Sequence, residues 1–380
     1  MGFVVVILLA WGAMHAYAWT HVRIHAGLGT RTASVLGLAM LVLMVAPIAG
    51  MMLVRAGRSA IGRPVEVVGM VWAGALFLFL GVALVRDLWN GLFALAGRVH
   101  PGARAFRLVG PRVLAVELAA VAALCAYALI EPWRIRTECV RLESPKLTAE
   151  RPRVRIAVLA DVHVGSTVGR RRLARIAERV RRAEPDILLS AGDLVDAEMK
   201  DSAELARILA DLPAPLGKFA VTGNHEYYAG LGHSVDFTGR AGFALLADAC
   251  ARPVEGLTVA GVNDPTGRRG PFRDGGGRSE QAVLSDAGDG DFVVLLKHRP
   301  VVEAGSIDRM DLQVSGHSHR GQIFPFSLLV ALYYEHGHGL VEVAPGTHLY
   351  TSRGTGTWGP PMRFLSPPEV TVIDLVRAAR

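Results

Sequence analysis

Four long apolar segments in the first third of the 380-residue sequence constrain its fold more than any other feature. They cover residues 2–19, 32–54, 65–85 and 111–130. A helix needs roughly 20 mostly apolar residues to cross the hydrocarbon core of a bilayer. The alternative is a buried helical core, but that would require polar faces and helix caps, which the second and third segments lack over their length. We therefore predict four transmembrane helices.

The first segment could instead be a signal peptide. No positive charge precedes it, no small-residue cleavage site stands out, and three more apolar segments follow, so we expect it to be retained. Residues 88–96 are too short to cross a bilayer, and we expect them to lie along the interface as an amphipathic segment. The resulting organisation is a transmembrane region (1–130), a linker (131–152) and a second domain (153–380).

The composition agrees with a membrane protein and argues against a nucleic-acid partner. Hydrophobic residues make up 51% of the chain, charged residues 20%, and the mean hydropathy is +0.33. The net charge of +7 arises entirely within residues 1–150, which hold 14 Lys and Arg against 7 Asp and Glu. Residues 151–380 balance 27 against 27. The basic excess therefore suits anionic lipid headgroups better than a nucleic-acid groove.

Loop charges give a weak indication of topology. Four spans place both ends of the chain on one side of what we expect to be the cell inner membrane. The loops on one side of the membrane carry six basic residues, and those on the other side carry seven. Four of these seven follow the last span; if they are counted as part of a folded domain instead, the remaining charges favour an extracytoplasmic second domain.

The three cysteines are Cys125, Cys139 and Cys250. They show no C-x-x-C spacing, so we expect them to be unpaired, although a disulfide between Cys139 and Cys250 stays open outside the cytoplasm.

The second domain alternates short apolar runs with amphipathic ones. Residues 154–160, 187–190, 219–222, 257–262, 292–296 and 312–315 are predicted strands, and residues 173–180 and 202–212 are predicted helices. Residues 268–280, rich in glycine, are expected to form a surface loop. Such alternation is typical of an α/β fold in which helices cover a sheet.

Five polar clusters each follow a predicted strand. They are Asp161-Val-His163, Gly-Asp193, Gly-Asn224-His225-Glu226, Lys-His298 and Gly-His317-Ser-His319. The carboxyl ends of strands in open α/β sheets form binding crevices, so the clusters are expected to converge. Carboxylate, amide and imidazole groups suit hard and borderline divalent ions such as Mn²⁺, Fe²⁺ or Zn²⁺, and the absence of cysteine argues against a purely thiophilic metal. The sequence therefore predicts a site for two divalent metal ions.

The order D-x-H, G-D, G-N-H-D/E, H and G-H-x-H resembles the calcineurin-like metallophosphoesterases, from about residue 153 to the C-terminus. The resemblance implies an α/β sandwich with the metal site at the ends of its strands. It also implies that Asp161, His163 and His319 bind one metal, that Asn224, His298 and His317 bind the other, and that Asp193 bridges them. His225 resembles the family histidine that protonates the leaving oxygen or stabilises the phosphoryl charge.

Two stretches resemble a membrane-anchored subgroup of this family: residues 321–326, and residues 352–363 with Arg353 and Arg363. The two arginines fit phosphate or headgroup oxygens. The alternative is that they pair with acids or pack on Trp358.

Glu117 lies within a predicted span. Burying a carboxylate in the membrane costs free energy, so such a residue indicates a function; the alternative is that Glu117 lies at the level of the lipid headgroups. The other histidines, including His15, His21, His25, His336 and His338, are expected to be interface or loop residues.

The substrate class follows only from the membrane anchor and the resemblance. A catalytic domain tied to four spans stays near the bilayer, which favours a lipid-linked phosphoester by local concentration. Some members of the broad group hydrolyse the pyrophosphate of UDP-2,3-diacylglucosamine in lipid A synthesis, which would require a cytoplasmic domain. An envelope phosphoester is the competing substrate, and a catalytically silent metal-binding scaffold or sensor is the non-enzymatic alternative.

Overall fold

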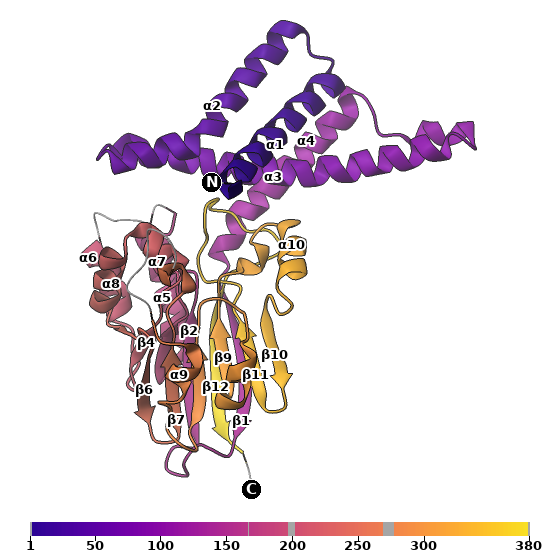
Figure 1. Ribbon diagram of the computed structural model, residues 1–380. Helices are drawn as coiled ribbons and strands as arrows, with labels where there is room; N and C mark the ends of the chain where they lie inside the picture. Colours follow the sequence, from indigo (N-terminus) through magenta and orange to yellow (C-terminus); the bar gives the residue numbers. More distant parts are fainter. Residues whose placement is uncertain (1, 166, 197–201, 269–276, 379–380) are drawn as a thin grey trace. The chain divides into compact units, whose positions relative to one another are not determined.

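The computed structural model describes residues 2–165, 167–196, 202–268 and 277–378. The chain divides into two compact units (Figure 1). Unit 1 contains Met1–Ile130 with two short segments from later in the chain, Ile323–Pro325 and Gly359–Phe364. Unit 2 contains Glu131–Gln322, Phe326–Trp358 and Leu365–Arg380.

Unit 1 is built on four helices that are long and apolar enough to cross a membrane. They are α1 (Gly2–Ala26), α2 (Thr30–Arg55), α3 (Ser59–Ala96) and α4 (Pro111–Ile130), with a short 3₁₀ helix, η1 (Pro101–Phe106), before α4. The prediction of four spans is confirmed. Glycines bring α2 and α3 into close contact: a Cβ on Gly50 would lie 2.3 Å from the backbone nitrogen of Glu66. Small residues at such crossings are a common feature of membrane helices.

The expectation of a separate interfacial segment at residues 88–96 is wrong, because α3 continues through them. Asn90 and Trp89 explain the continuation. The Asn90 side chain donates to the Leu108 carbonyl at 2.9 Å and accepts from the Leu108 N–H at 2.7 Å, and the Trp89 indole donates to the Phe106 carbonyl at 2.9 Å. These bonds tie the last turns of α3 to the connection that leads into α4.

The two late segments of unit 1 correct the expected domain boundary at residue 153. Ile323 and Met362 are buried in one apolar cluster with Leu78 of α3 and Ala128 of α4. The backbone N–H of Arg363 donates to the Ala128 carbonyl at 2.9 Å. The first segment falls within, and the second overlaps, the stretches that resembled the membrane-anchored subgroup, so apolar packing on the helices accounts for Ile323 and Met362 in them.

Unit 2 contains two six-stranded sheets. The first has the order β1-β12-β2-β3-β4-β5 and the second β10-β11-β9-β8-β7-β6. The strands are β1 (Arg136–Ser144), β2 (Arg153–Leu159), β3 (Ile187–Ser190), β4 (Lys218–Ala220), β5 (Ala244–Leu245), β6 (Ala249–Val254), β7 (Leu257–Gly261), β8 (Phe292–Leu296), β9 (Leu312–Ser315), β10 (Gly339–Ala344), β11 (Thr347–Thr351) and β12 (Glu369–Arg377). All six predicted strands are present. Neighbours β2, β3, β4 and β5 pair in parallel, as do β7, β8 and β9.

Helices accompany the sheets, as the α/β prediction required. They are α5 (Arg170–Ala183), α6 (Ser202–Ala210), α7 (Asn224–Ala229), α8 (Leu231–Arg240), α9 (Glu280–Leu284) and α10 (Phe326–Tyr333), with 3₁₀ turns η2 (Glu131–Trp133), η3 (Pro265–Arg268), η5 (Ala304–Arg309) and η6 (His319–Gly321). The α5, α6, α7 and α8 helices lie on one side of the strands (Figure 1). Of the expected loop at 268–280, residues 269–276 lie outside the described residues.

Strand β2 shows how the core is divided. Its Ile156 and Val158 belong to an apolar cluster with β7, β8 and β9 of the second sheet, whereas Ala157 and Leu159 belong to a cluster with α5. Successive side chains of a strand point to opposite faces, so a continuously apolar run is what a strand buried on both faces requires. The result is a β-sandwich with helices outside it.

The expected linker at residues 131–152 also needs correction. Residues 136–144 form β1, which pairs in parallel with β12 over its whole length, and η2 precedes it. Leu142 points into the core between the sheets. Charged residues alternate with apolar ones in this strand, which is common in strands at the edge of a sheet. The low hydrophobicity of the segment is the reason that no strand was predicted there. The three cysteines are free, so no bridge joins Cys139 to Cys250.

Candidate metal centre

The predicted ligands lie on loops with a specialised backbone. Five of the ten non-glycine residues with positive φ in the described part of the chain are candidate ligands: Asp161, His163, Asp193, His317 and His319, with φ between 46° and 71°. For residues with a Cβ this conformation is uncommon and costs about 1–3 kcal/mol each. Such a concentration of strained residues points to a functional site.

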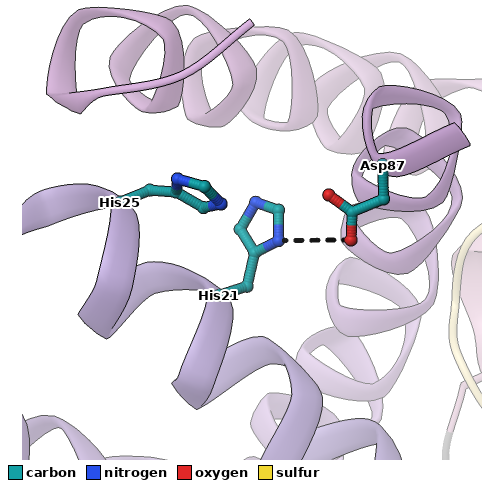
Figure 2. Close-up of side chains that lie close together, drawn as sticks. All are labelled: His21, His25 and Asp87. Carbon is teal, nitrogen blue, oxygen red and sulfur yellow. Dashed lines mark ion pairs between the residues drawn. The ribbon is translucent and has the colours of Figure 1, made fainter. Parts of the chain in front are cut away.

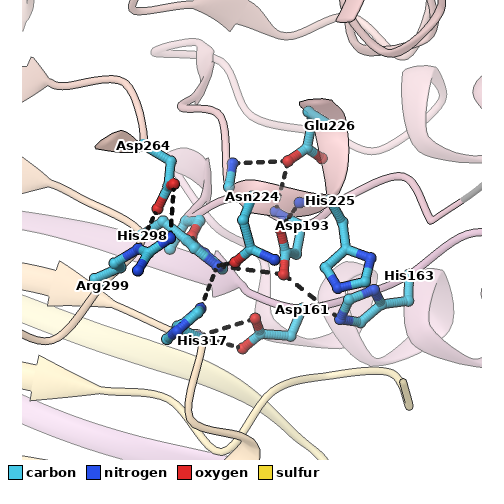
Figure 3. A network of polar contacts seen from close by, with 12 residues as sticks. Asp161, His163, Asp193, Asn224, His225, Glu226, Asp264, His298, Arg299 and His317 are labelled. Carbon is cyan, nitrogen blue, oxygen red and sulfur yellow. Dashed lines mark hydrogen bonds and ion pairs between the residues drawn. The ribbon is translucent and has the colours of Figure 1, made fainter. Parts of the chain in front are cut away.

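One group of ligands consists of Asp161, His163 and His319, all buried. The Nε2 atoms of His163 and His319 lie 3.0 Å apart, and His319 Nε2 lies 3.9 Å from Asp161 Oδ1. Both carboxylate oxygens of Asp161 accept from the backbone N–H of His317, at 2.9 and 3.0 Å. The first loop therefore fixes the position of the last one (Figure 3).

A second group consists of Asp193, His298 and His317, with Asn224 beside it (Figure 3). His298 Nε2 lies 3.2 Å from Asp193 Oδ2, 3.1 Å from His317 Nδ1 and 3.2 Å from Asn224 Oδ1. This grouping matches the second ligand set that the resemblance implied.

Asp193 lies between the two groups. Its Oδ2 is 3.2 Å from His298 Nε2 and 3.7 Å from His163 Nε2, while its Oδ1 accepts from the backbone N–H of His225 at 2.9 Å. Close packing holds it there: a Cβ on Gly223 would lie 2.1 Å from Asp193 Oδ1, so only glycine fits at that position. One carboxylate oxygen thus faces both groups, as a bridging ligand must.

The donor set fits metal ions. Ligands bound to one ion at about 2.0–2.2 Å lie about 3 Å apart when adjacent, and the nitrogen–nitrogen and nitrogen–oxygen distances above include such values. Hydrogen bonds also fix the ring orientations, as is usual for metal-binding histidines. His298 Nδ1 lies 2.9 Å from the Ala191 carbonyl and His163 Nδ1 lies 3.1 Å from Asp196, so each ring donates from Nδ1 and, when it is neutral, presents the lone pair of Nε2 to the site.

The electrostatics of the buried site favour positive charge. Burial raises the pKa of Asp161 and would raise that of Asp193, but the charge of His298 holds the pKa of Asp193 well below its usual range. Burial opposes the charge of His298, but Asp193 outweighs it and raises the pKa of His298 to about 10. Burial, followed by the charge of His298, lowers the pKa of His317 to about 3. A carboxylate that keeps one imidazole protonated in this way would equally attract a cation.

Asp196 is a site residue that the sequence analysis missed. Its Oδ1 lies 3.1 Å from His163 Nδ1 and 2.8 Å from His225 Nδ1, so one carboxylate orients a candidate ligand and the candidate acid. Those two hydrogen bonds outweigh burial and lower the pKa of Asp196. Burial would lower the pKa of His225, but Asp196 and then Asp193 raise it above its ordinary value. The only sequence signal was the spacing of three residues from Asp193.

Glu226 also has a role that its motif did not reveal. This buried carboxylate accepts from the backbone N–H groups of Gly223 at 2.7 Å, Asp193 at 3.0 Å and Val195 at 3.1 Å. Burial and the nearby Asp193 raise its pKa, against the effect of these hydrogen bonds. Glu226 therefore holds two ligand loops together without facing the ligand groups itself (Figure 3).

Arg299, next to His298, forms a two-pronged ion pair with Asp264. Its Nε lies 2.7 Å from Asp264 Oδ2 and its Nη2 lies 3.1 Å from Oδ1. Burial opposes the charge of Asp264, but Arg299 lowers the pKa of Asp264 below its usual value. The pair fixes the chain on one side of His298 (Figure 3).

The structure does not place Arg353 and Arg363 as free phosphate contacts. The Arg353 guanidinium is buried against two carboxylates, Glu369 at 2.5 Å and Glu138. It is paired with acids, which was the alternative interpretation. Arg363 is completely buried. The attribution of both arginines to phosphate rested on side-chain chemistry alone. The acidic partners of Arg353 come from strands β1 and β12, 215 and 16 residues away in the sequence.

Aromatic side chains surround the accessible part of the centre. The His225 ring is 5.3 Å from that of Tyr228 and 5.7 Å from that of Trp358, measured between centroids, and the His317 ring is 6.0 Å from that of Tyr334. Tyr228 and Trp358 are more than half exposed, at 51% and 54%. Together with Tyr334 they form the aromatic rim of the centre.

Comparison with known proteins agrees with this geometry. Residues 154–321 match the model of the calcineurin-like phosphoesterase family. An Aquifex aeolicus protein named as an uncharacterized metallophosphoesterase is 39% identical over 253 residues, which are 66% of this chain and 96% of that protein. A Helicobacter pylori protein of the same name is 35% identical over 59% of this chain and 60% of its own length. A Danio rerio transmembrane protein with metallophosphoesterase domain is 29% identical over 80% of this chain and 72% of its own.

This chain belongs to the calcineurin-like metallophosphoesterase family. It is a membrane protein and a metal-dependent hydrolase of phosphoester bonds. The predicted fold and enzyme class are confirmed, and the structure brings the seven predicted ligands together.

Proposed function

We propose that this protein is a membrane-anchored phosphoesterase that uses two divalent ions to hydrolyse a phosphodiester or pyrophosphate bond in a lipid-linked substrate. The observation that carries the catalytic part is the position of Asp193 Oδ2, which faces both ligand groups. Asp161, His163 and His319 would hold one ion, and Asn224, His298 and His317 the other. Bound ions of this kind lower the pKa of water and neutralise phosphate oxygens during in-line displacement.

His225 is proposed to be the general acid. Its Nδ1 is engaged by Asp196 at 2.8 Å, which leaves Nε2 as the position from which a proton can pass to the leaving oxygen. The raised pKa of His225 keeps that proton available near neutral pH. His225 also lies close enough to His163 and Asp193 to be a third metal-binding group, so metal content distinguishes the two roles.

An apolar surface next to the centre supports an amphiphilic substrate. Helix α10 begins seven residues after the last ligand, His319, and buries none of its side chains. Its exposed apolar residues are Phe326, Leu328, Leu329, Leu332 and Tyr333. Soluble proteins seldom leave such a patch uncovered. Together with the aromatic rim, this α10 face can accept the apolar part of a substrate whose phosphate reaches the metal ions.

The proposed location is the inner membrane, with the catalytic domain outside the cytoplasm. The distribution of arginines in the loops supports this orientation. The proposed substrate class is then a lipid-linked or envelope phosphoester. Hydrolysis of UDP-2,3-diacylglucosamine, one candidate of this class, would instead require a cytoplasmic catalytic domain.

The substrate proposal is tested with the full-length protein in nanodiscs, stripped of metal and reloaded with Mn²⁺, Fe²⁺ or Zn²⁺. Turnover of bis-p-nitrophenyl phosphate is compared with that of UDP-2,3-diacylglucosamine and of an undecaprenyl-linked pyrophosphate. The proposal predicts a higher kcat/KM for at least one lipid-linked substrate. Faster turnover of the water-soluble diester than of every lipid would contradict it, and metal binding without turnover of any substrate would favour the scaffold alternative.

A further inference from the structure

Unit 1 contains a group of polar side chains that the phosphoesterase activity does not use. We call it the bundle cluster, and it consists of Tyr17, His21 and His25 of α1, Arg86 and Asp87 of α3, and Glu117 of α4. Polar and charged side chains inside membrane bundles are costly and usually serve a function. This cluster also changes the interpretation of His21 and His25, which we had expected to be interface or loop residues.

Three members of the bundle cluster are arranged like metal ligands. His21 and His25 are four residues apart on α1 and so share one face of the helix, and Asp87 faces them from α3. Figure 2 shows the His21 ring between His25 and Asp87. One ligand atom from each residue lies within 4.8 Å of the others, and His21 Nδ1 is 4.0 Å from Asp87 Oδ2.

Partners outside this triad hold two of the ligands in place. His21 Nε2 lies 3.1 Å from Glu117 Oε2, and the Tyr17 hydroxyl donates to Asp87 Oδ2 at 2.6 Å. Metal-binding histidines usually donate their second ring N–H to a carboxylate in this way. Without a bound ion, Arg86 Nη1 donates to His21 Nε2 at 2.6 Å and to Glu117 Oε2 at 2.8 Å, which places the N–H of His21 on Nδ1. Binding an ion at Nδ1 therefore requires the N–H to move to Nε2, where Glu117 Oε2 accepts it, while Arg86 keeps its hydrogen bond to Glu117.

The net charge of the bundle cluster is compatible with a bound cation. Arg86 is neutralised by Glu117, and within the described residues no Lys or Arg lies within ion-pair distance of Asp87. With both imidazoles neutral, the bundle cluster carries a net charge of −1. Glu117 Oε1 is buried and has no hydrogen-bond partner in the described part of the chain. A carboxylate among apolar helices is stabilised by a bound cation.

The position also allows an ion to enter. His25 is half-buried and is the penultimate residue of α1, and the Asp87 side chain is 41% exposed. Two imidazoles and one carboxylate suit a transition-metal ion and leave coordination positions open for water or another ligand. His15 is different, because its Nδ1 bonds to the Trp11 carbonyl at 2.8 Å and its Nε2 accepts from the Trp72 indole at 3.0 Å.

We propose that His21, His25 and Asp87 form a second metal site, separate from the catalytic centre, which binds one divalent transition-metal ion such as Zn²⁺ within the helical bundle. The metal-dependent activity does not require this site.

The experiment counts bound Zn²⁺ in the full-length protein in nanodiscs at a buffered free Zn²⁺ concentration, by elemental analysis. His25→Gln and Asp87→Asn are each expected to remove one equivalent relative to the wild type, whatever number the catalytic centre holds. His15→Gln is the matched control and should keep the wild-type number. Phosphoesterase turnover should be unchanged in His25→Gln, which shows that the variant is folded and its catalytic centre loaded.

A second readout covers the case in which a variant alters folding. Tyr17→Phe retains all three ligands but leaves Asp87 without its hydrogen bond, so Zn²⁺ affinity at this site is expected to fall about 10- to 100-fold. The proposal is overturned if His25→Gln and Asp87→Asn bind as much Zn²⁺ as the wild type. That result would mean that the bundle cluster binds no Zn²⁺ and that a proton balances its negative charge. It is also overturned if the lost equivalent is accompanied by lost turnover, because the metal removed is then catalytic.

Discussion

Asp193 and Asp196 lie three residues apart, yet the structure gives them different tasks. Asp193 faces both ligand groups, whereas Asp196 contacts the outer nitrogens of His163 and His225. Asp193 was predictable because ligands follow strands in a recognisable order. Asp196 was not, because its role depends on two histidines that the fold brings together from different loops. Arg353 was misjudged for a similar reason, since its partner Glu138 lies 215 residues away in the sequence, although Glu369 lies only 16 residues away.

His225→Ala tests the assignment of the general acid. Removal of a positioned acid is expected to lower kcat by about 100- to 10,000-fold, while the metal content stays at the wild-type level. Steady-state kinetics and elemental analysis on the same preparation check both expectations. Loss of metal in this variant would instead make His225 a ligand.

Asp196→Asn tests the positioning role of Asp196. The amide can still accept a hydrogen bond but carries no charge to orient and polarise the two imidazoles, so we expect kcat to fall about 10- to 100-fold. The apparent KM for Mn²⁺ should rise, because His163 loses its orienting carboxylate. Wild-type kinetics in this variant would show that the contacts of Asp196 serve the fold alone.

At the scale of elements, apolar runs were easier to predict than their ends. The buried strands were found because they are continuously apolar. Strand β1 was taken for a linker because it lies at a sheet edge with charged residues in it, and its pairing with β12 joins segments more than 200 residues apart. The length of α3 was underestimated because polar Asn90 is satisfied by Leu108 of the following connection, a contact that local sequence does not reveal.

Strands β2 and β12 are joined by an ion-paired network that predicts a pH-dependent stability. Asp374 of β12 accepts from Arg155 at 2.9 Å and from Arg153 at 2.8 Å, and the hydrogen bond from Arg155 lowers the pKa of Asp374 despite some burial. A carboxyl whose pKa is lowered in the folded state contributes stability above its unfolded pKa, and this contribution is lost as the pH falls through the folded value.

Asp374→Asn is therefore expected to lower the free energy of unfolding at pH 7 by about 0.5–1 kcal/mol, since the network is partly exposed. The difference from the wild type should shrink as the pH falls below about 4. Thermal unfolding in detergent from pH 3 to 7 measures it, with the exposed Glu150→Gln as control. A deficit that is equally large at pH 3 and pH 7 would contradict the electrostatic explanation.

Helix α10 gives a prediction about substrate binding. Leu332 is 84% exposed, and replacing it by serine removes apolar surface that we propose contacts the lipid part of the substrate. Burying a leucine side chain contributes about 1.5–3 kcal/mol, so Leu332→Ser should raise KM for a lipid-linked substrate about tenfold or more. KM for bis-p-nitrophenyl phosphate should not change. Val301→Ser, which alters an exposed apolar residue outside α10, is the control, and equal effects of both variants would reject a role for α10.

At the scale of the whole molecule, the chain combines a membrane bundle with a phosphoesterase sandwich, and both parts were predicted from hydrophobic pattern and motif order. The division between them was not, because Ile323–Pro325 and Gly359–Phe364 lie beyond the catalytic motifs in sequence but pack with α3 and α4. Expression of residues 151–380 alone would therefore remove β1 from its sheet and leave Ile323 and Met362 without the helices that bury them. Full-length protein is the appropriate material for every test of activity.

The most direct test of the central claim is Mn²⁺-dependent hydrolysis of bis-p-nitrophenyl phosphate by the full-length wild type and its Asp193→Asn variant, after metal removal and reloading. A neutral amide does not bridge two cations as a carboxylate does. We expect Mn²⁺ to restore turnover in the wild type and in the exposed-site control Asp289→Asn, and the Asp193→Asn variant to remain at the metal-free level. Wild-type turnover in Asp193→Asn would contradict a centre in which Asp193 bridges two metal ions.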